Sequence, residues 1–320
     1  MVDVSICIMT YNHEQYIMKC IESVLTQKVN FSYEIIVSDD ASVDKTVDII
    51  EKKYGSVIRI NRQSKNQGIA RNLYDLLKLA TGNYIVTLAG DDFYVNDHFL
   101  QMAYDFLEKH KGFVSANDWV RIVDKTGENE IYTERAPRKI YTLTDFLWNT
   151  PMECNYMLMV RNIYKEDGLE WLYKVSRIND ELQYPFWTLL HGDMAVLPIV
   201  GHAYRTNSNG SNYNSLYKAI DTFSDRYKAC NYLDKIYEGR YEFKYIKKAV
   251  GYNAFRAAMG DLLKRQDSVQ LKRFIREIPF KERIRVYVTV PLLLLGNGNF
   301  PRWYKKLKKV VYNEVETNNS

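Results

Sequence analysis

The residues best suited to chemistry are two adjacent aspartates, Asp91 and Asp92, which directly follow the apolar run YIVTL at residues 84–88 and Ala89-Gly90. No lysine or arginine lies within six positions on either side. Neighbouring carboxylates repel each other unless a cation neutralises them, and hard divalent cations prefer carboxylate and phosphate oxygens. The pair therefore predicts a Mg²⁺ or Mn²⁺ site beside a phosphorylated ligand. The alternative is structural, with one aspartate capping the helix that follows and the other exposed.

A second acidic residue, Asp40, follows the predicted strand at 33–37. Its carboxylate could accept a hydrogen bond from a base N–H, such as N3–H of uracil. The sequence around it, Asp-Ala-Ser-Val-Asp, is also typical of turns and helix starts. Both interpretations stay open on the sequence alone.

Polar residues also follow the first predicted strand, residues 4–9, as Thr10, Tyr11 and Asn12. Tyr11 could stack on a nucleoside base, or it could be a packing aromatic. These three residues are candidates for a nucleoside pocket.

A third group of candidates opens the predicted helix at 69–80. Asn66 and Gly68 would let the backbone approach a ligand closely, although an ordinary turn explains them equally well. Arg71 could donate hydrogen bonds to a phosphate, or it could simply be solvated.

Short strands and helices alternate over the first 90 residues, which predicts how these side chains are positioned. We expect strands at 4–9, 33–37, 57–60 and 84–88, and helices at 14–26, 44–54 and 69–80. This alternation is typical of an α/β fold with a mostly parallel sheet and helices on both faces. Ligands bind outside the carboxyl ends of the strands in such sheets, which is where all three polar groups fall.

The pattern beyond Asp97 is mixed. We expect a helix at 98–110, a strand at 114–123, a loop or hairpin at 127–140 and a helix at 180–191. Two further strands, 194–199 and 201–204, and a Gly/Ser/Asn-rich loop at 207–214 follow, before a mainly helical C-terminal extension at 216–320.

Composition places the chain among ordinary globular proteins. It has 320 residues, of which 46% are hydrophobic and 26% charged, which excludes a wholly disordered chain. Its four cysteines are far apart, which excludes a disulfide scaffold or a cysteine-rich zinc site and favours a reducing compartment. We see neither a secretory leader nor an apolar run long enough to span a bilayer, and we expect a cytoplasmic protein.

Charge is unevenly distributed along the chain. Residues 1–215 hold 22 basic and 28 acidic side chains, a net of −6, whereas residues 216–320 hold 22 and 11, a net of +11. The apolar stretch at 286–295 lies among several of these lysines and arginines, a combination that suits an anionic membrane surface. The C-terminal region is therefore a candidate for peripheral attachment at the inner face of the cell membrane, or else a solvated helical surface. No zinc-finger or RNA-binding signature is present, so we expect no nucleic-acid partner.

Six segments in order resemble the family 2 glycosyltransferases: VSICIMTYN at 4–12, SVLTQ at 23–27, EIIVSDDASVDKT at 34–46, NQGIARN at 66–72, LAGDD at 88–92 and GDMAVLPIVGHAYR at 192–205. The resemblance covers about two thirds of the chain. It implies a Rossmann-like GT-A fold, with a nucleotide-sugar part at 1–97 and an acceptor part at 98–215.

The resemblance also implies an activity, namely transfer of a sugar with inversion, from a nucleotide-diphospho-sugar to a glycan or lipid-linked glycan. By the same resemblance, Thr10 and Tyr11 line the nucleoside pocket and Asp40 binds a uracil-like base. Asp91 faces the donor sugar or ribose, and Asp92 holds the Mn²⁺ or Mg²⁺ ion. Two departures from the family pattern are Ala89, where the family often has Asp, and Asn207, where it often has His.

An acceptor hydroxyl must lose a proton as it attacks, so a carboxylate base is expected on the opposite side of the donor. Asp180 and Glu181 stand just before the closing segment, where the family carries its base, and we favour Asp180, with Glu181 as the alternative. The alternative is that both are ordinary acids at the start of a helix. Trp171 and Trp187 flank the pair and could stack on an acceptor sugar, although core packing is the simpler role.

Two other functions remain open on the sequence. A nucleotidyltransferase acting on sugar phosphates also uses paired aspartates, but the residues after the first strand lack the usual Gly-rich basic loop. A non-catalytic subunit that binds a sugar nucleotide or glycan would need the same pocket without the base.

Overall fold

The computed structural model describes residues 2–136, 139–143, 159–164, 170, 173, 174 and 183–206. The chain divides into two compact units, Met1–Ala258 and Met259–Ser320, and all described residues belong to the first. The predicted loop at 207–214 and the extension at 216–320 lie outside the described residues.

The first 90 residues alternate strands and helices in the predicted order, each close to its expected bounds. They are β1 (Val4–Thr10), α1 (Ile17–Leu25), β2 (Tyr33–Asp39), α2 (Thr46–Tyr54), β3 (Ile58–Arg62), α3 (Ile69–Leu79) and β4 (Tyr84–Ala89). Both β1 and β4 are buried over nearly their whole length, as their continuous apolar runs predict for central parallel strands.

The following elements are more irregular. They are β5 (Phe93–Tyr94), α4 (Phe99–Lys109), β6 (Phe113–Val123), β7 (Glu130–Glu134), β8 (Ile140–Tyr141), β9 (Met159–Arg161), α7 (Gln183–Leu190) and β10 (Asp193–Arg205). The sequence pattern does not predict β5 and β9, because strands of two and three residues are too short to show an alternation of apolar and polar positions.

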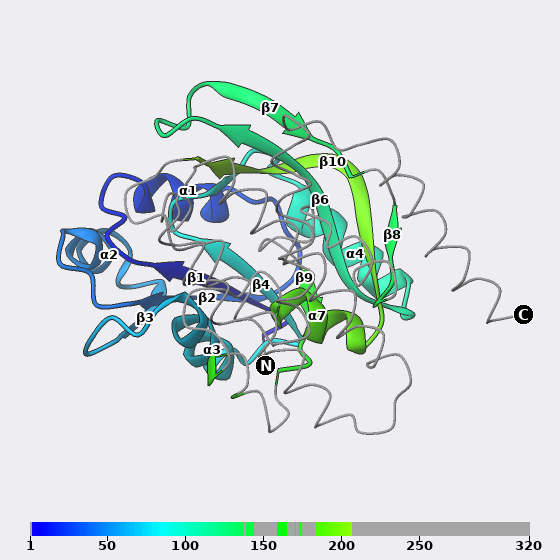
Figure 1. Cartoon of the computed structure of the whole chain (residues 1–320), viewed down its shortest axis with the longest axis horizontal. Helices are drawn as coiled ribbons and strands as arrows, with labels where there is room; N and C mark the ends of the chain where they lie inside the picture. Colours follow the sequence, from blue (N-terminus) through cyan, green and yellow to red (C-terminus); the bar gives the residue numbers. More distant parts are fainter. Residues whose placement is uncertain are drawn as a thin grey trace, which may run out of the picture. The chain divides into compact units, whose positions relative to one another are not determined.

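One sheet joins all the described strands in the order β3-β2-β1-β4-β9-β6-β10-β5, with β7 added to β6 and β8 added to β10 (Figure 1). The pairs β1–β2, β1–β4, β2–β3 and β6–β10 are parallel. The short strand β9 runs antiparallel to both β4 and β6 and thereby connects the two parallel parts. The α/β fold with a largely parallel sheet is therefore confirmed.

Strand β10 contains both segments predicted as strand, 194–199 and 201–204, and joins them across Val200. It is continuous from Asp193 to Arg205, but its register against β6 shifts between Val196 and Val200 and again before His202. Pro198 lies between Val196 and Val200, where the ladder is interrupted and a residue without an amide hydrogen costs no ladder bond. At the end of the bulged strand, Arg205 contacts the loop that follows β4.

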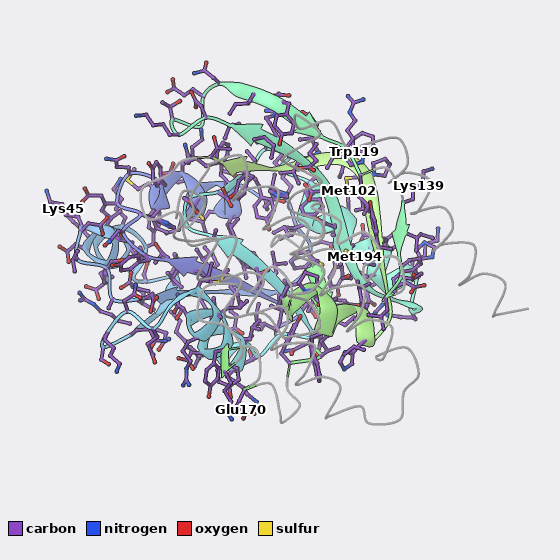
Figure 2. All side chains as sticks on the ribbon, viewed as in Figure 1. Lys45, Met102, Trp119, Lys139, Glu170 and Met194 are labelled. Carbon is purple, nitrogen blue, oxygen red and sulfur yellow. The ribbon has the colours of Figure 1, made fainter. Side chains whose placement is uncertain are left out.

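Helices cover both faces of the sheet, as expected. On one face, α1 and α4 pack on β1, β2 and β4 through residues that include Ile17, Ile21, Phe99 and Leu100. On the other, α3 and α7 pack through Leu73, Leu76 and Trp187, and Met194 of β10 lies in the same cluster. By contrast, Lys45 at the start of α2 is exposed and projects outward (Figure 2). Within the described part of the chain, no helix has the length and apolarity needed to cross a bilayer.

Candidate active site

The carboxyl ends of β1, β2 and β4 lie side by side at one edge of the sheet. In register, Thr10 is next to Asp39 of β2, and Met9 is next to Ala89 of β4. The amide of Asp40 donates a hydrogen bond to the carbonyl of Thr10 at 2.9 Å. The residues after the three strands therefore meet at one rim, as the parallel arrangement predicts.

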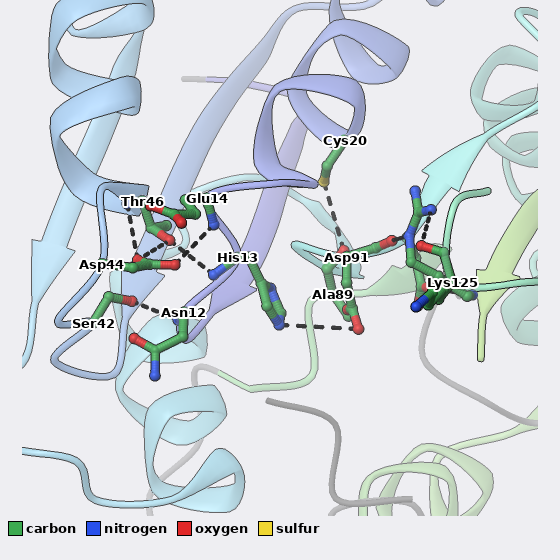
Figure 3. Close-up of polar contacts among 12 residues, drawn as sticks. Asn12, His13, Glu14, Cys20, Ser42, Asp44, Thr46, Ala89, Asp91 and Lys125 are labelled. Atoms are coloured by element: carbon green, nitrogen blue, oxygen red, sulfur yellow. Dashed lines mark hydrogen bonds and ion pairs between the residues drawn. The ribbon is translucent and has the colours of Figure 1, made fainter. Parts of the chain in front are cut away.

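The loop after β1 is held to the loop after β2 by side chains. Amides of the first loop donate to the second from Asn12 to Ser42 Oγ at 2.8 Å, from His13 to Thr46 Oγ1 at 2.8 Å and from Glu14 to Asp44 Oδ2 at 3.0 Å (Figure 3). In return, Asn12 Oδ1 accepts the amide of Val43 at 3.0 Å. Asn12 has φ = 56°, a left-handed conformation that asparagine tolerates well. These bonds fix the conformation of the loop after β1, which contains the half-buried Tyr11.

Asp40 binds the turn that precedes α3. Its Oδ1 accepts the amide of Gln67 at 2.7 Å, and its Oδ2 accepts the amide of Gly68 at 2.9 Å. Each carboxylate oxygen can accept more than one hydrogen bond, so these contacts are compatible with a base N–H as a further donor. The neighbouring Asp39 has a different role, because it is fully buried and accepts both the amide and the hydroxyl of Ser42.

The acid pair after β4 is enclosed. Asp92 is only 2% exposed, and its Oδ1 accepts the backbone amide of Arg205 at 2.7 Å. Burial and the charge of Asp91 raise the pKa of Asp92 well above its ordinary value, although the bond from Arg205 acts in the opposite direction. A negative charge at this position is therefore costly unless a positive partner is added.

His13 adjoins the acid pair and did not figure among the predicted site residues. Its Nε2 lies 3.9 Å from Asp91 Oδ2, and the side chain is largely buried (Figure 3). Among the described residues, neither His13 Nδ1 nor Thr10 Oγ1 has a hydrogen-bond partner. A Cβ on Gly90 would stand 2.9 Å and 3.0 Å from these two atoms, so Gly90 keeps this polar corner open.

Asp91 and Asp92 fit a divalent cation by their donor chemistry. They offer carboxylate oxygens, and the high pKa of Asp92 is the mark of a buried carboxylate without enough positive charge around it. No group of three or more His, Cys, Asp or Glu suited to a metal occurs in the described part of the chain. Mg²⁺ typically binds proteins through one or two carboxylates, with substrate phosphates and water as its other ligands.

The remaining candidates near α3 are engaged in local contacts. Asn66 is half-buried in the turn that Asp40 binds. The guanidinium of Arg71 forms an ion pair with Asp75 at 2.9 Å and lies 4.3 Å from the centre of the Tyr173 ring. A phosphate ligand would therefore share Arg71 with Asp75.

The acceptor side is only partly described. Trp187 is buried in the core cluster, where it tilts against His191, and so takes the packing role that was the simpler expectation. Asp180, Glu181 and Trp171 lie outside the described residues, and the choice of base stays a prediction.

Comparison with known proteins supports the resemblance. Residues 5–168 match the family described as Glycosyl transferase family 2. An uncharacterized protein of Mycobacterium tuberculosis (strain H37Rv) is 26% identical over 218 residues, which cover 64% of this chain and 59% of that protein. The chain thus spans less than two thirds of the length of these curated relatives.

Two matching relatives are described as poly(ribitol-phosphate) glycosyltransferases. The β-glucosyltransferase of Bacillus spizizenii is 34% identical over 138 residues, covering 42% of this chain and 22% of that protein. The β-N-acetylglucosaminyltransferase TarS of Staphylococcus aureus (strain Mu50) is 26% identical over 235 residues, covering 70% and 39%.

A solved structure of S. aureus TarS (residues 1–349) in complex with UDP-GlcNAc has the same fold. It superposes with a TM-score of 0.63 at 17% identity, over 87% of this chain and 82% of that one. The match to the family extends over half of the sequence and includes β1, β2, β4 and the rim at their carboxyl ends. The chain belongs to glycosyl transferase family 2.

Proposed function

We propose that this protein is an inverting glycosyltransferase that moves a sugar from a UDP-sugar to a hydroxyl group of a glycan polymer or lipid-linked glycan. The observation that carries the proposal is the rim at which Thr10, Asp40 and the acid pair Asp91–Asp92 meet. Family membership supports the reaction type. The relatives described as acting on poly(ribitol-phosphate) support a polymeric acceptor and a role in polysaccharide biosynthesis.

The nucleoside would lie between the loops after β1 and β2. Tyr11 offers a ring for stacking, and Asp40 offers acceptor oxygens for N3–H of uracil. Because both loops are bonded to each other, and Asp40 to the turn before α3, the pocket is largely formed before the donor arrives.

The diphosphate would lie beside Asp91 and Asp92, which would hold a Mn²⁺ or Mg²⁺ ion. When bound, this ion supplies positive charge against the negative charge that develops on the departing nucleotide. The chain itself contributes two carboxylates, of which that of Asp92 is almost completely buried, and electrostatic interactions are strong in such a position.

The acceptor hydroxyl requires a base on the opposite side of the donor sugar. Asp180 or Glu181 would take the hydroxyl proton as the oxygen attacks the anomeric carbon and the bond to the diphosphate breaks. The products are the glycosylated acceptor, with inverted configuration, and UDP.

The proposal is tested by incubating the protein with MnCl₂ and a panel of UDP-sugars, first alone and then with poly(ribitol-phosphate) or lipid-linked glycan. Release of UDP that rises with acceptor supports a glycosyltransferase. Formation of UTP and a sugar 1-phosphate when pyrophosphate is added would indicate a nucleotidyltransferase instead. Binding of a UDP-sugar without any release of UDP would indicate a non-catalytic subunit.

The basic C-terminal third suggests a location for the acceptor. Its net charge of +11 would attract an anionic membrane surface that carries lipid-linked glycans. Co-sedimentation with vesicles of phosphatidylglycerol and phosphatidylcholine, at low and high salt, checks this part. Lack of binding at low salt would remove the membrane from the proposal and leave the transfer reaction intact.

A further inference from the structure

Arg205 is a buried cation at the end of β10, next to the acid pair. It is 2% exposed, and its Nε donates a hydrogen bond to the backbone carbonyl of Asp91 at 2.7 Å. Its own amide donates to Asp92 Oδ1 at 2.7 Å. One residue therefore holds both members of the acid pair, one through its side chain and the other through its backbone.

The guanidinium lies among aromatic rings. Its Cζ is 4.7 Å from the centre of the Tyr16 ring and 5.4 Å from that of Phe93. No carboxylate within the described residues lies at ion-pair distance from it. A buried guanidinium needs partners in a fixed geometry, and here backbone carbonyls and ring faces provide them.

The turn between β6 and β7 packs against this guanidinium and accepts a hydrogen bond from it. Arg205 Nη1 donates to the carbonyl of Lys125 at 3.0 Å. Gly127 has φ = 74°, and a Cβ at this position would stand 2.7 Å from Arg205 Nη2 and 2.8 Å from Cζ. The turn is fixed in its own right, because Asp124 accepts hydrogen bonds from the amides of Thr126 and Gly127 and from the Asn129 side chain. Only glycine satisfies both the backbone conformation and the lack of space.

We infer that Arg205, which is held by the β6–β7 turn, is a positioning residue that keeps the Asp91–Asp92 loop in place for a divalent cation. Without the guanidinium, the carbonyl of Asp91 loses its buried donor, and the acidic loop keeps only the bond from the Arg205 amide to Asp92 as its tie to this residue. Partners that orient metal-binding groups in this way typically contribute 10- to 100-fold to metal affinity. This inference rests on the proposed function, because it assumes that the acid pair binds a cation together with a nucleoside diphosphate.

The experiment compares the wild-type chain with Arg205→Met, Arg205→Lys and Gly127→Ala. Gly127→Ala displaces the guanidinium without changing it. Gly112→Ala is the matched control, because a Cβ at Gly112 meets nothing within 4 Å. For each protein, calorimetry measures the affinity for UDP in EDTA, and then the MnCl₂ concentration at half-maximal enhancement of UDP binding. Electron paramagnetic resonance counts the bound Mn²⁺.

We expect Arg205→Met and Gly127→Ala to raise the Mn²⁺ midpoint roughly 10- to 100-fold, while UDP affinity in EDTA stays within about twofold. The Mn²⁺ midpoint of Arg205→Lys should lie between those of these two variants and that of the wild type, and the midpoint of Gly112→Ala should match the wild type. Combining Arg205→Met with Gly127→Ala should raise the Mn²⁺ midpoint no further than Arg205→Met alone, since both changes act through one guanidinium. If Arg205→Met does not fold, Arg205→Lys and Gly127→Ala carry the test.

Unchanged Mn²⁺ midpoints in folded variants would overturn the inference, and so would an equal loss of UDP affinity in EDTA, which would indicate a purely structural role. The proposed function fails in a different way. If the wild-type protein does not bind UDP with Mn²⁺, then transfer from a UDP-sugar is wrong; if it binds none of UDP, GDP, CDP or ADP with Mn²⁺, the inference falls as well.

Discussion

Asp118 of β6 and His202 of β10 form a buried pair, with His202 Nδ1 2.9 Å from both carboxylate oxygens. The same carboxylate accepts the amides of Gly201 at 2.7 Å and His202 at 2.8 Å. These contacts lie where the register of β10 shifts, three residues before Arg205. Asp118 thus compensates for ladder bonds that the bulged strand cannot make, and it keeps the end of β10 beside the acid pair.

Asp118→Ala should lower the free energy of unfolding by about 3 kcal/mol or more, because it leaves buried N–H groups without an acceptor. Asp118→Asn keeps one acceptor oxygen and should cost less. Urea unfolding followed by circular dichroism measures both. Asp105→Ala, at an exposed position on α4, is the control and should change stability by less than about 0.5 kcal/mol. An equal effect of the Asp118 and Asp105 variants would contradict this role.

Asp92→Asn should abolish the effect of Mn²⁺ on UDP binding and reduce turnover at least about 100-fold, since a Lewis acid contributes several kcal/mol. The same variant should melt at a higher temperature than the wild type at pH 7. Burial and the charge of Asp91 raise the pKa of Asp92, so its charged form opposes folding, whereas an amide can accept the Arg205 amide without a charge. Calorimetric melting with and without MnCl₂ checks both statements. A lower melting temperature would show that the carboxylate has a positive partner in the metal-free protein.

Asp40→Asn should weaken the binding of UDP and uridine by the same factor, roughly 10-fold or more, because a hydrogen bond to a charged group contributes about 1.5–3 kcal/mol. The reason is that the proposed function assigns Asp40 to the base and not to the phosphates. The ratio of UDP to CDP affinity should also fall, since cytosine has no N3–H to donate. Titration calorimetry in EDTA measures all three ligands. A loss confined to UDP with Mn²⁺ would assign Asp40 to the phosphate side instead.

The environment of Glu34, near the amino end of β2, predicts that the protein loses stability in acid. Burial alone would raise its pKa, but hydrogen bonds from Ser5 Oγ and from the amide and hydroxyl of Thr81 outweigh this and lower it. A lowered pKa in the folded state means that the stabilisation is complete above the unfolded value of about 4.3 and disappears as pH falls through the folded value.

Glu34→Gln should therefore be less stable than the wild type by about 1 kcal/mol at pH 7, after allowance for partial exposure. The difference should vanish in acid, as urea unfolding between pH 2.5 and 7 would measure. Glu51→Gln, exposed on α2, is the control for removing a surface carboxylate. A difference that persists at the lowest pH would assign the loss to packing.

Asp180→Asn or Glu181→Gln should cut kcat about 100-fold or more, as expected when a general base is removed, while UDP affinity stays unchanged. Steady-state kinetics together with calorimetry separates the two quantities. The residue whose variant loses turnover is the base. Wild-type rates in both single variants would require a base elsewhere on the acceptor side.

The sequence by itself determined the alternation of strands and helices up to β4 and the edge at which Thr10, Asp40 and Asp91 meet. The carboxyl ends of neighbouring parallel strands must lie at the same edge of the sheet, and continuous apolar runs identify buried strands. The ion pair of Arg71 with Asp75 could also have been expected, because the two residues are four positions apart on a helix.

Only the tertiary structure decided how the acid pair is supported. Arg205 is 113 residues from Asp92, and Gly127 belongs to a turn that showed no motif. Contacts of this kind depend on which strands become neighbours and on how much room remains between side chains, and neither leaves a periodic signal in the sequence. The continuous, bulged course of β10 has the same origin, because Asp118 of β6 accepts the amides of Gly201 and His202 where the register of the strand shifts.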